Sequence, residues 1–437
     1  MDRNMRTFTF RKGRVFDALG AKDAQNQKAL GKAVHVASRL HRQRFCRPNW
    51  ISVCLFWLFC ICLSVTCGSE AVPRCGHPAQ PHVSDRLFES GKVLHLELVI
   101  GEKEAASLRR HPRDYVVCTL RMGKDEFPYV ALRLKGGAGS FQHLDKRPSF
   151  TLNTDKFHDG QKFFGLDKLH LNNSSQDPTY LKEWLCARLF LKAGVPTARA
   201  THALVEINGR RLGLYVLKEG YDKTFLKRHF TNHKGNLYDG GDQSDILAPL
   251  ELERGDGPQD RSDLSALVKA CQTKDPNLRF QIMTEELDVA CFCSFLAMEI
   301  MTWHWDGYAM KGNNYRLYSD PSQGGFVFIP HGMDQMFWQV DGPIYPQIQG
   351  IVARAFLQTD QGKAMYRHRL SQLTEEVFQP EALLADIDPV EERIAQTIGN
   401  PEQERIYRHH VDRLRRAIKE RYRFLNATPK TNPNFTR

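Results

Sequence analysis

Alternation of hydrophobic and polar residues in the first half of the chain predicts a series of β-strands. The predicted strands are Val93–Ile100, Tyr115–Arg121, Phe127–Lys135, Ser149–Asn153, Lys168–Asn172, Ala203–Ile207 and Leu212–Leu217. The last two flank Asn208-Gly209, a dipeptide typical of a tight hairpin turn. A glycine loop, Gly136–Ser140, separates the third predicted strand from the fourth.

Apolar residues at helical spacing dominate the second half. One helix is predicted at Tyr180–Ala193; Asp177 can cap its start and Gly194 can close its end, while Pro178 suits its first position. Further helices are expected at Glu102–His111, at Lys223–His229, from a cap at Thr284 to about Met301, and near 352–375, 380–397 and 401–425, with short strands at Tyr315–Tyr318 and Phe326–Ile329. Residues 240–262, rich in Gly, Asp and Pro, are expected to form a mobile surface loop. The expected fold class is α+β, with a β-rich N-terminal part and a helical C-terminal part.

A stretch without any charged residue, Trp50–Cys67, follows a basic arm formed by residues 1–49. Its length is about the minimum with which a helix crosses a bilayer. The positive-inside rule places the arm in the cytoplasm and the rest of the chain outside. Two interpretations stay open: a signal-anchor helix that remains, or a signal peptide cleaved near Val65–Gly68.

The predicted organisation has five parts, which are a basic cytoplasmic arm (1–49), a transmembrane signal anchor or signal peptide (50–68), a linker (69–90), a main domain (91–425) and a polar tail (426–437). The protein is therefore expected to be anchored in a membrane through residues 50–67 with its body outside the cytoplasm, or to be secreted. The exported part contains six cysteines, which permits disulfides. Three of them lie in apolar, helix-like stretches that favour buried free thiols: Cys186, Cys291 and Cys293.

The net charge of +11 is unevenly distributed. Residues 1–49 carry 12 Lys and Arg against three Asp, which leaves only +2 for the rest of the chain. A body that binds nucleic acid would be basic throughout or along one face. The charge distribution therefore argues against nucleic acid as a partner.

Two aspartates in the last third are the strongest candidates for chemistry. Asp306 follows a predicted helix, Asn314 comes eight residues later, and Asp334 follows a predicted strand. Phosphoryl transfer by a protein kinase uses one Asp to orient the attacking hydroxyl, and an Asn and a second Asp to hold Mg²⁺. Because Asp and Asn are also common in turns, the pattern depends for its weight on the sequence that precedes it.

The stretch from Val93 to Trp338 resembles the CotH family of atypical secreted kinases. Several blocks carry the resemblance in order, namely Leu132–Ser140, Lys146–Phe150, Phe164–Asn173, Gly194–Arg199, Ile207–Gly209 and Gly213–Tyr215, followed by Asp306, Asn314 and Asp334. Family members often have Trp-Asp-x-Asp at the second aspartate site, whereas this chain has His331-Gly-Met-Asp334. The resemblance implies an atypical protein-kinase-like fold.

The resemblance also implies roles for particular residues. Asp306 would be the catalytic aspartate, and Asp334 would bind the metal together with Asn314 or, alternatively, Asn313. The positive charge for the phosphates would come from Lys146 or Lys135, held by Glu219 or Glu183, and the glycine loop with Gly137 and Gly139 would cover the nucleotide. The cofactors would be ATP and Mg²⁺ or Mn²⁺, in agreement with the preference of these ions for oxygen ligands.

Three functions follow as expectations. The first is a metal-dependent kinase that transfers the γ-phosphoryl group of ATP to a hydroxyl, of Ser or Thr, on an exported or envelope protein. The second is a non-catalytic envelope or surface module on the same fold. The third is a metal-dependent phosphoesterase, which would share the carboxylates but would not need the lysine.

Overall fold

The computed structural model describes residues 81–241 and 244–428. The predicted basic arm (1–49) and the apolar segment (50–68) therefore lie outside the described residues, as does the chain beyond residue 428. Within the described ranges, no helix is both long enough and apolar enough to cross a membrane.

Within residues 81–241, seven strands close into a barrel in the order β1-β2-β3-β4-β5-β7-β6. Their bounds are β1 Leu94–Val99, β2 Val116–Met122, β3 Asp125–Lys135, β4 Ser149–Asn153, β5 Lys168–Asn172, β6 Ala200–Ile207 and β7 Arg210–Glu219. Neighbouring strands are antiparallel except at the closing pair, where β1 runs parallel to β6. Apolar side chains such as Leu98, Leu132 and Leu217 fill a buried cluster on the barrel strands. Closure removes the free sheet edges that an open sheet would expose.

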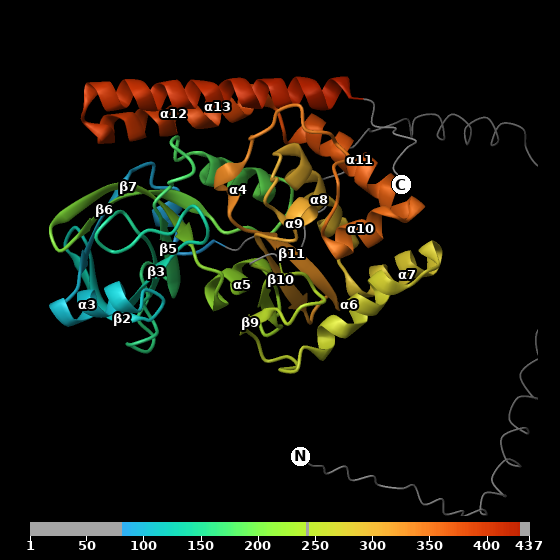
Figure 1. The fold of residues 1–437 in the computed structure, drawn as a ribbon, viewed down its shortest axis with the longest axis horizontal. Coiled ribbons are helices and arrows are strands. Elements are labelled where there is room, and N and C mark those ends of the chain that lie inside the picture. The colour runs from blue at the N-terminus through green and yellow to red at the C-terminus, as the bar shows by residue number, and fades with distance from the viewer. Residues whose placement is uncertain (1–80, 242–243, 429–437) are drawn as a thin grey trace, which may run out of the picture. The chain divides into compact units, whose positions relative to one another are not determined.

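The remaining strands form a second sheet in the order β11-β10-β8-β9, which are Gly325–Pro330, Tyr315–Asp320, Leu237–Asp239 and Glu251–Arg254. The helices are α2 Asp85–Phe88, α3 Glu102–Arg110, α4 Lys182–Lys192, α5 Lys223–His229, α6 Ser262–Gln272, α7 Pro276–Glu286, α8 Val289–Met301, α9 Tyr308–Lys311, α10 Ile351–Leu357, α11 Asp360–Glu376, α12 Pro380–Ile398 and α13 Pro401–Ala427. In Figure 1 the barrel lies to the left, helices α6, α7, α10 and α11 lie to the right, and α12 and α13 run along the top. The predicted α+β class, with its β-rich N-terminal part and helical C-terminal part, is confirmed.

The helix predicted to begin at Thr284 is divided into two. Asp288 rather than Thr284 caps α8, because its carboxylate accepts a hydrogen bond from the backbone N–H of Cys291. Leu287 forms a bridge to Phe326 in β11, and this pairing with the sheet takes the chain out of the helical conformation between α7 and α8. The predicted helix near 352–375 is likewise divided, because Thr359 caps α11. The expected loop at 240–262 contains β9.

Helix α4 begins at Lys182, two residues after the predicted start. Asp177 still serves the start of the helix, because its buried carboxylate accepts hydrogen bonds from Lys182 N at 2.9 Å and from Thr179 N at 3.0 Å. Burial raises the pKa of Asp177. Pro178 lies in the turn before the helix and not at its first position.

Two of the three cysteine predictions are confirmed. Cys186 and Cys293 carry buried free thiols. Cys291 was expected to be a free thiol but is disulfide-bonded. An apolar helical environment is compatible with either state, so the local pattern around Cys291 could not distinguish them.

Helix α13 is fixed to the rest of the fold by a buried arginine. The Arg421 side chain donates hydrogen bonds to the carbonyl oxygens of Ile300 and Met301 at the end of α8, and to those of Val340 and Gly342. No part of Arg421 is exposed to solvent, and burial lowers its pKa to about 10. Arg421 therefore connects α13 to the segments that follow α8 and β11.

We expect Arg421→Met to lower the free energy of unfolding by about 3 kcal/mol, because four carbonyl oxygens would lose their donor inside the protein. Urea unfolding followed by circular dichroism measures the change. Arg416→Met, on the same helix but exposed, should change stability by less than about 0.5 kcal/mol. Equal stability of the two variants would show that the buried guanidinium does not hold α13 in place.

Candidate active site

A fully buried ion pair joins the barrel to α4. Lys218, in β7, donates a hydrogen bond from Nζ to Oε1 of Glu183, in the first turn of α4, at 2.5 Å. Burial alone would favour the neutral amine, but the Glu183 carboxylate holds the pKa of Lys218 above its usual value. The second oxygen of Glu183 accepts a hydrogen bond from the backbone N–H of Met333 at 3.2 Å. Glu183 therefore connects Lys218 to the turn that carries Asp334.

Asp334 lies in a short 3₁₀ turn, Met333–Gln335, directly after β11. The chain reaches this turn through Gly332, whose φ of +59° suits a residue without a side chain. Burial raises the pKa of Asp334 to about 6, and the carboxylates of Glu183 and Asp177 add to the effect. Burial thus disfavours the ionised carboxylate of Asp334, which a bound cation would stabilise.

Lys135, at the end of β3, belongs to the same cluster. Its Nζ donates a hydrogen bond to Oδ1 of Asn172 at 2.6 Å. Burial and the nearby Lys218 ammonium lower the pKa of Lys135 to about 8, whereas the carboxylates of Glu183 and Asp334 act in the opposite direction. Two lysines and two carboxylates are thus close enough to influence one another, and Lys135 takes part although it is not the lysine paired with Glu183.

Asp306 lies in the loop between α8 and α9, held by two asparagine side chains. Asn313 donates from Nδ2 to one carboxylate oxygen of Asp306 at 3.2 Å, and Asn314 donates from Nδ2 to the other at 2.9 Å. The backbone carbonyl of Asn314 accepts from His331 N at 3.0 Å. A Cβ atom on Gly332 would lie only 2.5 Å from Oδ1 of Asn314. The Asp306 loop and the Asp334 turn are therefore in direct contact.

Two buried side chains that the sequence analysis missed support the Asp306 loop. Glu299, in α8, accepts hydrogen bonds from the backbone N–H groups of Tyr308 at 2.9 Å and Ala309 at 2.8 Å, and burial raises its pKa to about 8. His304 Nε2 lies 2.9 Å from the carbonyl oxygen of His331, and burial lowers the pKa of His304. Glu299 is the only charged residue in an otherwise apolar helix, which is the signal that could have identified it.

Against the family pattern Trp-Asp-x-Asp, His331 stands at the position of the tryptophan, and Gly332 stands at the position of the first aspartate. The Nδ1 of His331 lies 3.3 Å from Nζ of Lys218. Burial and the Lys218 ammonium lower the pKa of His331 well below its usual value, so the ring is neutral and can accept a hydrogen bond from Lys218. The histidine therefore contributes no negative charge to the site.

Glu219 and Lys146 lie elsewhere. Glu219 is fully buried between two arginines, Arg199 and Arg228, at 3.0 Å and 2.7 Å. Although burial would raise its pKa, Arg228 and Arg199 hold the pKa of Glu219 at about 2. Lys146 is exposed in the turn before β4. The structure brings neither residue to the Lys218–Glu183 pair.

The glycine loop connects β3, which ends at Lys135, to β4. Gly137 and Gly139 are exposed, and Gly139 has a φ of +80°. A Cβ atom on Gly139 would lie 2.9 Å from the side-chain nitrogen of Gln176, which precedes α4. The loop therefore extends from the end of the strand that carries Lys135 to the segment before α4.

The described residues contain no group of three or more His, Cys, Asp or Glu side chains that could hold a metal ion. Asp334 and the Oδ1 of Asn314 offer oxygen ligands of the type that Mg²⁺ and Mn²⁺ prefer, and the raised pKa of Asp334 fits a cation beside it. Magnesium at phosphoryl-transfer sites takes one or two carboxylates from the protein and further oxygens from phosphate. The residues present fit a metal that is bound together with a nucleotide.

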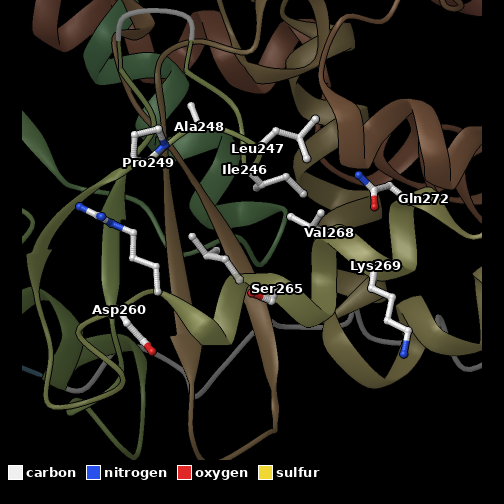
Figure 2. Close-up of a pocket in the computed structure, with 11 residues that line it drawn as sticks. Ile246, Leu247, Ala248, Pro249, Asp260, Ser265, Val268, Lys269 and Gln272 are labelled. Carbon is white, nitrogen blue, oxygen red and sulfur yellow. The ribbon is translucent and has the colours of Figure 1, made fainter. Parts of the chain in front are cut away.

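A separate pocket of about 470 Å³ lies between residues 246–249 and α6. Figure 2 shows Ile246, Val268 and Ser265 among the side chains around it. None of the site residues described above lines this pocket. It is therefore distinct from the cluster around Lys218 and Asp334.

We expect the Glu219 carboxylate to make the free energy of unfolding fall as the pH is lowered below about 4.5. Its pKa of about 2 lies below the ordinary 4.5, so its stabilisation is complete above about pH 4.5 and is lost as the pH falls toward 2. The expected loss is on the order of 3 kcal/mol. Urea unfolding at neutral pH and at pH 3 captures about 2 kcal/mol of this loss, because the loss is complete only below the folded-state pKa of about 2.

Glu219→Gln should be less stable than wild type at neutral pH and should show a flatter dependence on pH, because two buried arginines lose their shared partner. Glu285→Gln, at an exposed position of α7, is the matched control and should follow the wild type. A Glu219→Gln variant with the pH dependence of the wild type would contradict the assignment.

A family model described as CotH kinase protein matches residues 132–425. The chain is similar to inner spore coat protein H of Bacillus subtilis, with 24% identity over 263 residues that cover 54% of this chain and 70% of that protein. It is also similar to invasin CotH2 of Rhizopus delemar, with 24% identity over 307 residues that cover 61% of this chain and 50% of that protein. The chain thus spans only about half the length of this fungal relative.

Two solved structures are similar at a lower level. The proinflammatory kinase CtkA of Helicobacter pylori has 9% identity and a TM-score of 0.32, over 68% of this chain and 95% of that chain. The Golgi casein kinase with Mn/ADP bound has 6% identity and a TM-score of 0.31, over 91% and 98%. At such low TM-scores the two structures add no detail about the site of this chain.

Proposed function

This chain belongs to the CotH kinase protein family, and we propose that it transfers the γ-phosphoryl group of ATP to a hydroxyl group of a protein. The observation that carries the proposal is the buried Lys218–Glu183 pair, linked through Met333 N to the turn of Asp334. Protein kinases require a lysine–glutamate ion pair together with a metal-binding aspartate. A buried ion pair adds little net stability, so stability alone does not account for it.

Lys218 is the lysine that would contact the phosphates. The sequence analysis did not consider Lys218, which directly follows the predicted strand Leu212–Leu217, and Lys146 and Lys135 were the candidates that the resemblance implied. Lys135 retains a role as a second positive group, because it lies close enough to Lys218 and Asp334 for their charges to affect its pKa. Of the two acidic candidates, Glu183 holds Lys218.

Asp334, with Asn314 or Asn313, would hold Mg²⁺ or Mn²⁺. When bound, the ion neutralises charge on the phosphate oxygens. Asn314 also orients Asp306 through its Nδ2, so the same side chain connects the metal-binding turn to the catalytic loop. The glycine loop, with Gly137 and Gly139, would cover the nucleotide from the side of β3.

Asp306 would position the acceptor hydroxyl and take its proton. In the reaction, the acceptor oxygen forms a bond to the γ-phosphorus, the bond from that phosphorus to the β,γ-bridging oxygen breaks, and ADP leaves. The amide groups of Asn313 and Asn314 fix both carboxylate oxygens of Asp306, which reduces its freedom to turn away from the acceptor.

The acceptor we propose is Ser or Thr on an exported or envelope protein, and the expected location is membrane-anchored or secreted. The names of the relatives, a spore coat protein and an invasin, support a surface-associated setting. The disulfide at Cys291 also supports it, because disulfides persist in oxidising compartments.

We expect MgATP or MnATP to stabilise the full-length protein by roughly 3–6 °C in a thermal-shift assay at about 100 times Kd. Asp334→Asn should abolish the shift. The double variant Lys218→Met/Glu183→Gln should abolish it too, and it avoids leaving one buried charge without its partner. Lys146→Ala, which changes an exposed lysine, should keep the full shift. No shift in the wild type at millimolar nucleotide would favour a non-catalytic binding module.

Asp306→Asn separates binding from chemistry. The variant should keep the nucleotide-induced shift, because Asp306 is assigned to the acceptor and not to the phosphates. Its rate of phosphoryl transfer from radiolabelled ATP, measured on the protein itself or on an added acceptor, should fall about 10²- to 10⁴-fold. An unchanged rate would exclude Asp306 as the group that takes the proton.

A further inference from the structure

Two adjoining pockets lie along one face of α13. The first, of about 370 Å³, lies between α13 and the barrel and is lined by Tyr180, Leu204 and Ile406 among others. The second, of about 460 Å³, is lined by Lys182, Trp338 and Arg413 among others. The pockets share two residues, Pro178 and His410. They therefore adjoin, and we call the two together the α13 groove.

The α13 groove is long enough for several residues of an extended chain. Its α13 side runs from Gln403 through Tyr407, His410 and Arg413 to Ala417, at intervals of three or four residues that place them on one helix face. This face spans about 21 Å at the rise of an α-helix. An extended peptide of about six residues has the same length.

One end of the α13 groove adjoins the candidate active site. Lys182 directly precedes Glu183 in the chain, and Trp338 follows Asp334 by four residues. Asp177, which lines the same pocket, accepts a hydrogen bond from the backbone N–H of Lys182 at 2.9 Å. A polypeptide lying in the groove would therefore pass close to the Asp334 turn.

The side chains that line the α13 groove are not balanced in charge. Lys182 and Arg413 make no ion pair within the described residues. Asp177 is the only carboxylate that lines either pocket, and its oxygens already accept hydrogen bonds from Thr179 and Lys182 N. Lys182 is the side chain whose charge acts most strongly on Asp177, so Arg413 is the cation without a carboxylate among the residues that line this end of the groove. The end near the active site thus carries a net positive charge, which suits carboxylates on a partner.

The other end of the α13 groove is more apolar, although Arg147, which donates hydrogen bonds to Leu212 O and to the Tyr180 hydroxyl, also lines it. Leu204 and Leu214 line it on the barrel side, and Ile406, with 46% of its surface exposed, lines it on α13. Trp338, at the opposite end, is 74% exposed. Large apolar side chains left open to solvent along a groove are typical of surfaces that bind a partner.

We infer that the α13 groove binds an extended segment of the protein acceptor, with apolar side chains near Ile406 and acidic side chains near Lys182 and Arg413. The identity of the partner as an acceptor rests on the proposed function, whereas the preference for an acidic segment rests on the groove alone. The basic arm (1–49) and the tail after residue 428, which contains Lys430 and Arg437 but no acidic residue, carry the wrong charge to occupy it.

Fluorescence anisotropy with the full-length protein tests the inference. One labelled probe carries two leucines, a serine and three glutamates, and its twin carries lysines in place of the glutamates. We expect the acidic probe to bind at least about tenfold more tightly than its twin, and Arg413→Glu to weaken it by at least about tenfold. Arg416→Glu, an exposed change on α13 outside both pockets, should leave binding unchanged.

The same preparations are assayed for the thermal shift with MgATP, so that the two proposals fail separately. If the wild type prefers the acidic probe and Arg413→Glu loses this preference, the result supports binding of an acidic segment in the α13 groove, even where no nucleotide binds. Equal binding of both probes, or loss of binding in Arg416→Glu to the same degree as in Arg413→Glu, overturns the groove while a nucleotide shift still supports the kinase.

Discussion

The arrangement of the site depends on the buried pair between Lys218 and Glu183. Lys218 lies in β7 and Glu183 in α4, 35 residues apart in the sequence. Glu183 also accepts a hydrogen bond from the backbone N–H of Met333, which lies 150 residues after it. Each charge would be strongly unfavourable in this interior without the other. The pair therefore fixes the relative positions of the barrel, α4 and the Asp334 turn. A shift of any one of these segments would leave a buried charge without its partner.

Around this pair, the two aspartate segments are held by contacts that leave little freedom. Asn314 binds the Asp306 carboxylate through its amide and packs against Gly332, while His304 lies in hydrogen-bonding distance of the His331 carbonyl. Asn314 itself has a φ of +51°, in the left-handed region. Such a conformation costs about 1–2 kcal/mol and persists where the surroundings fix it, as at functional sites. The contacts thus preorganise both aspartates before any ligand binds.

Most strands and helices could be predicted from the sequence because their local patterns are strong. The order of Asp306, Asn314 and Asp334 along the chain also predicted that they belong to one site. The sequence could not predict barrel closure, because β1 and β6 pair across more than 100 residues. Nor could the sequence predict which of the neighbours Lys218 and Glu219 points into the site. The two are adjacent at the end of one strand, and alternation sends one toward Glu183 and the other toward Arg199 and Arg228. Only the three-dimensional neighbours decide which of them belongs to the site.

Helix α13 links the stability of the site to its access. Through Arg421 it binds the carbonyls at the end of α8, which leads to Asp306, and those of the segment that follows Asp334. Two turns earlier, Arg413 lines the α13 groove and makes no such contacts. Because the two residues serve separate surfaces, a change at Arg413 can alter what the groove binds while the Arg421 anchor keeps both aspartate segments in place. A substitution at Arg413 would therefore leave the hydrogen bonds that Arg421 makes to the segments beside Asp306 and Asp334 unchanged.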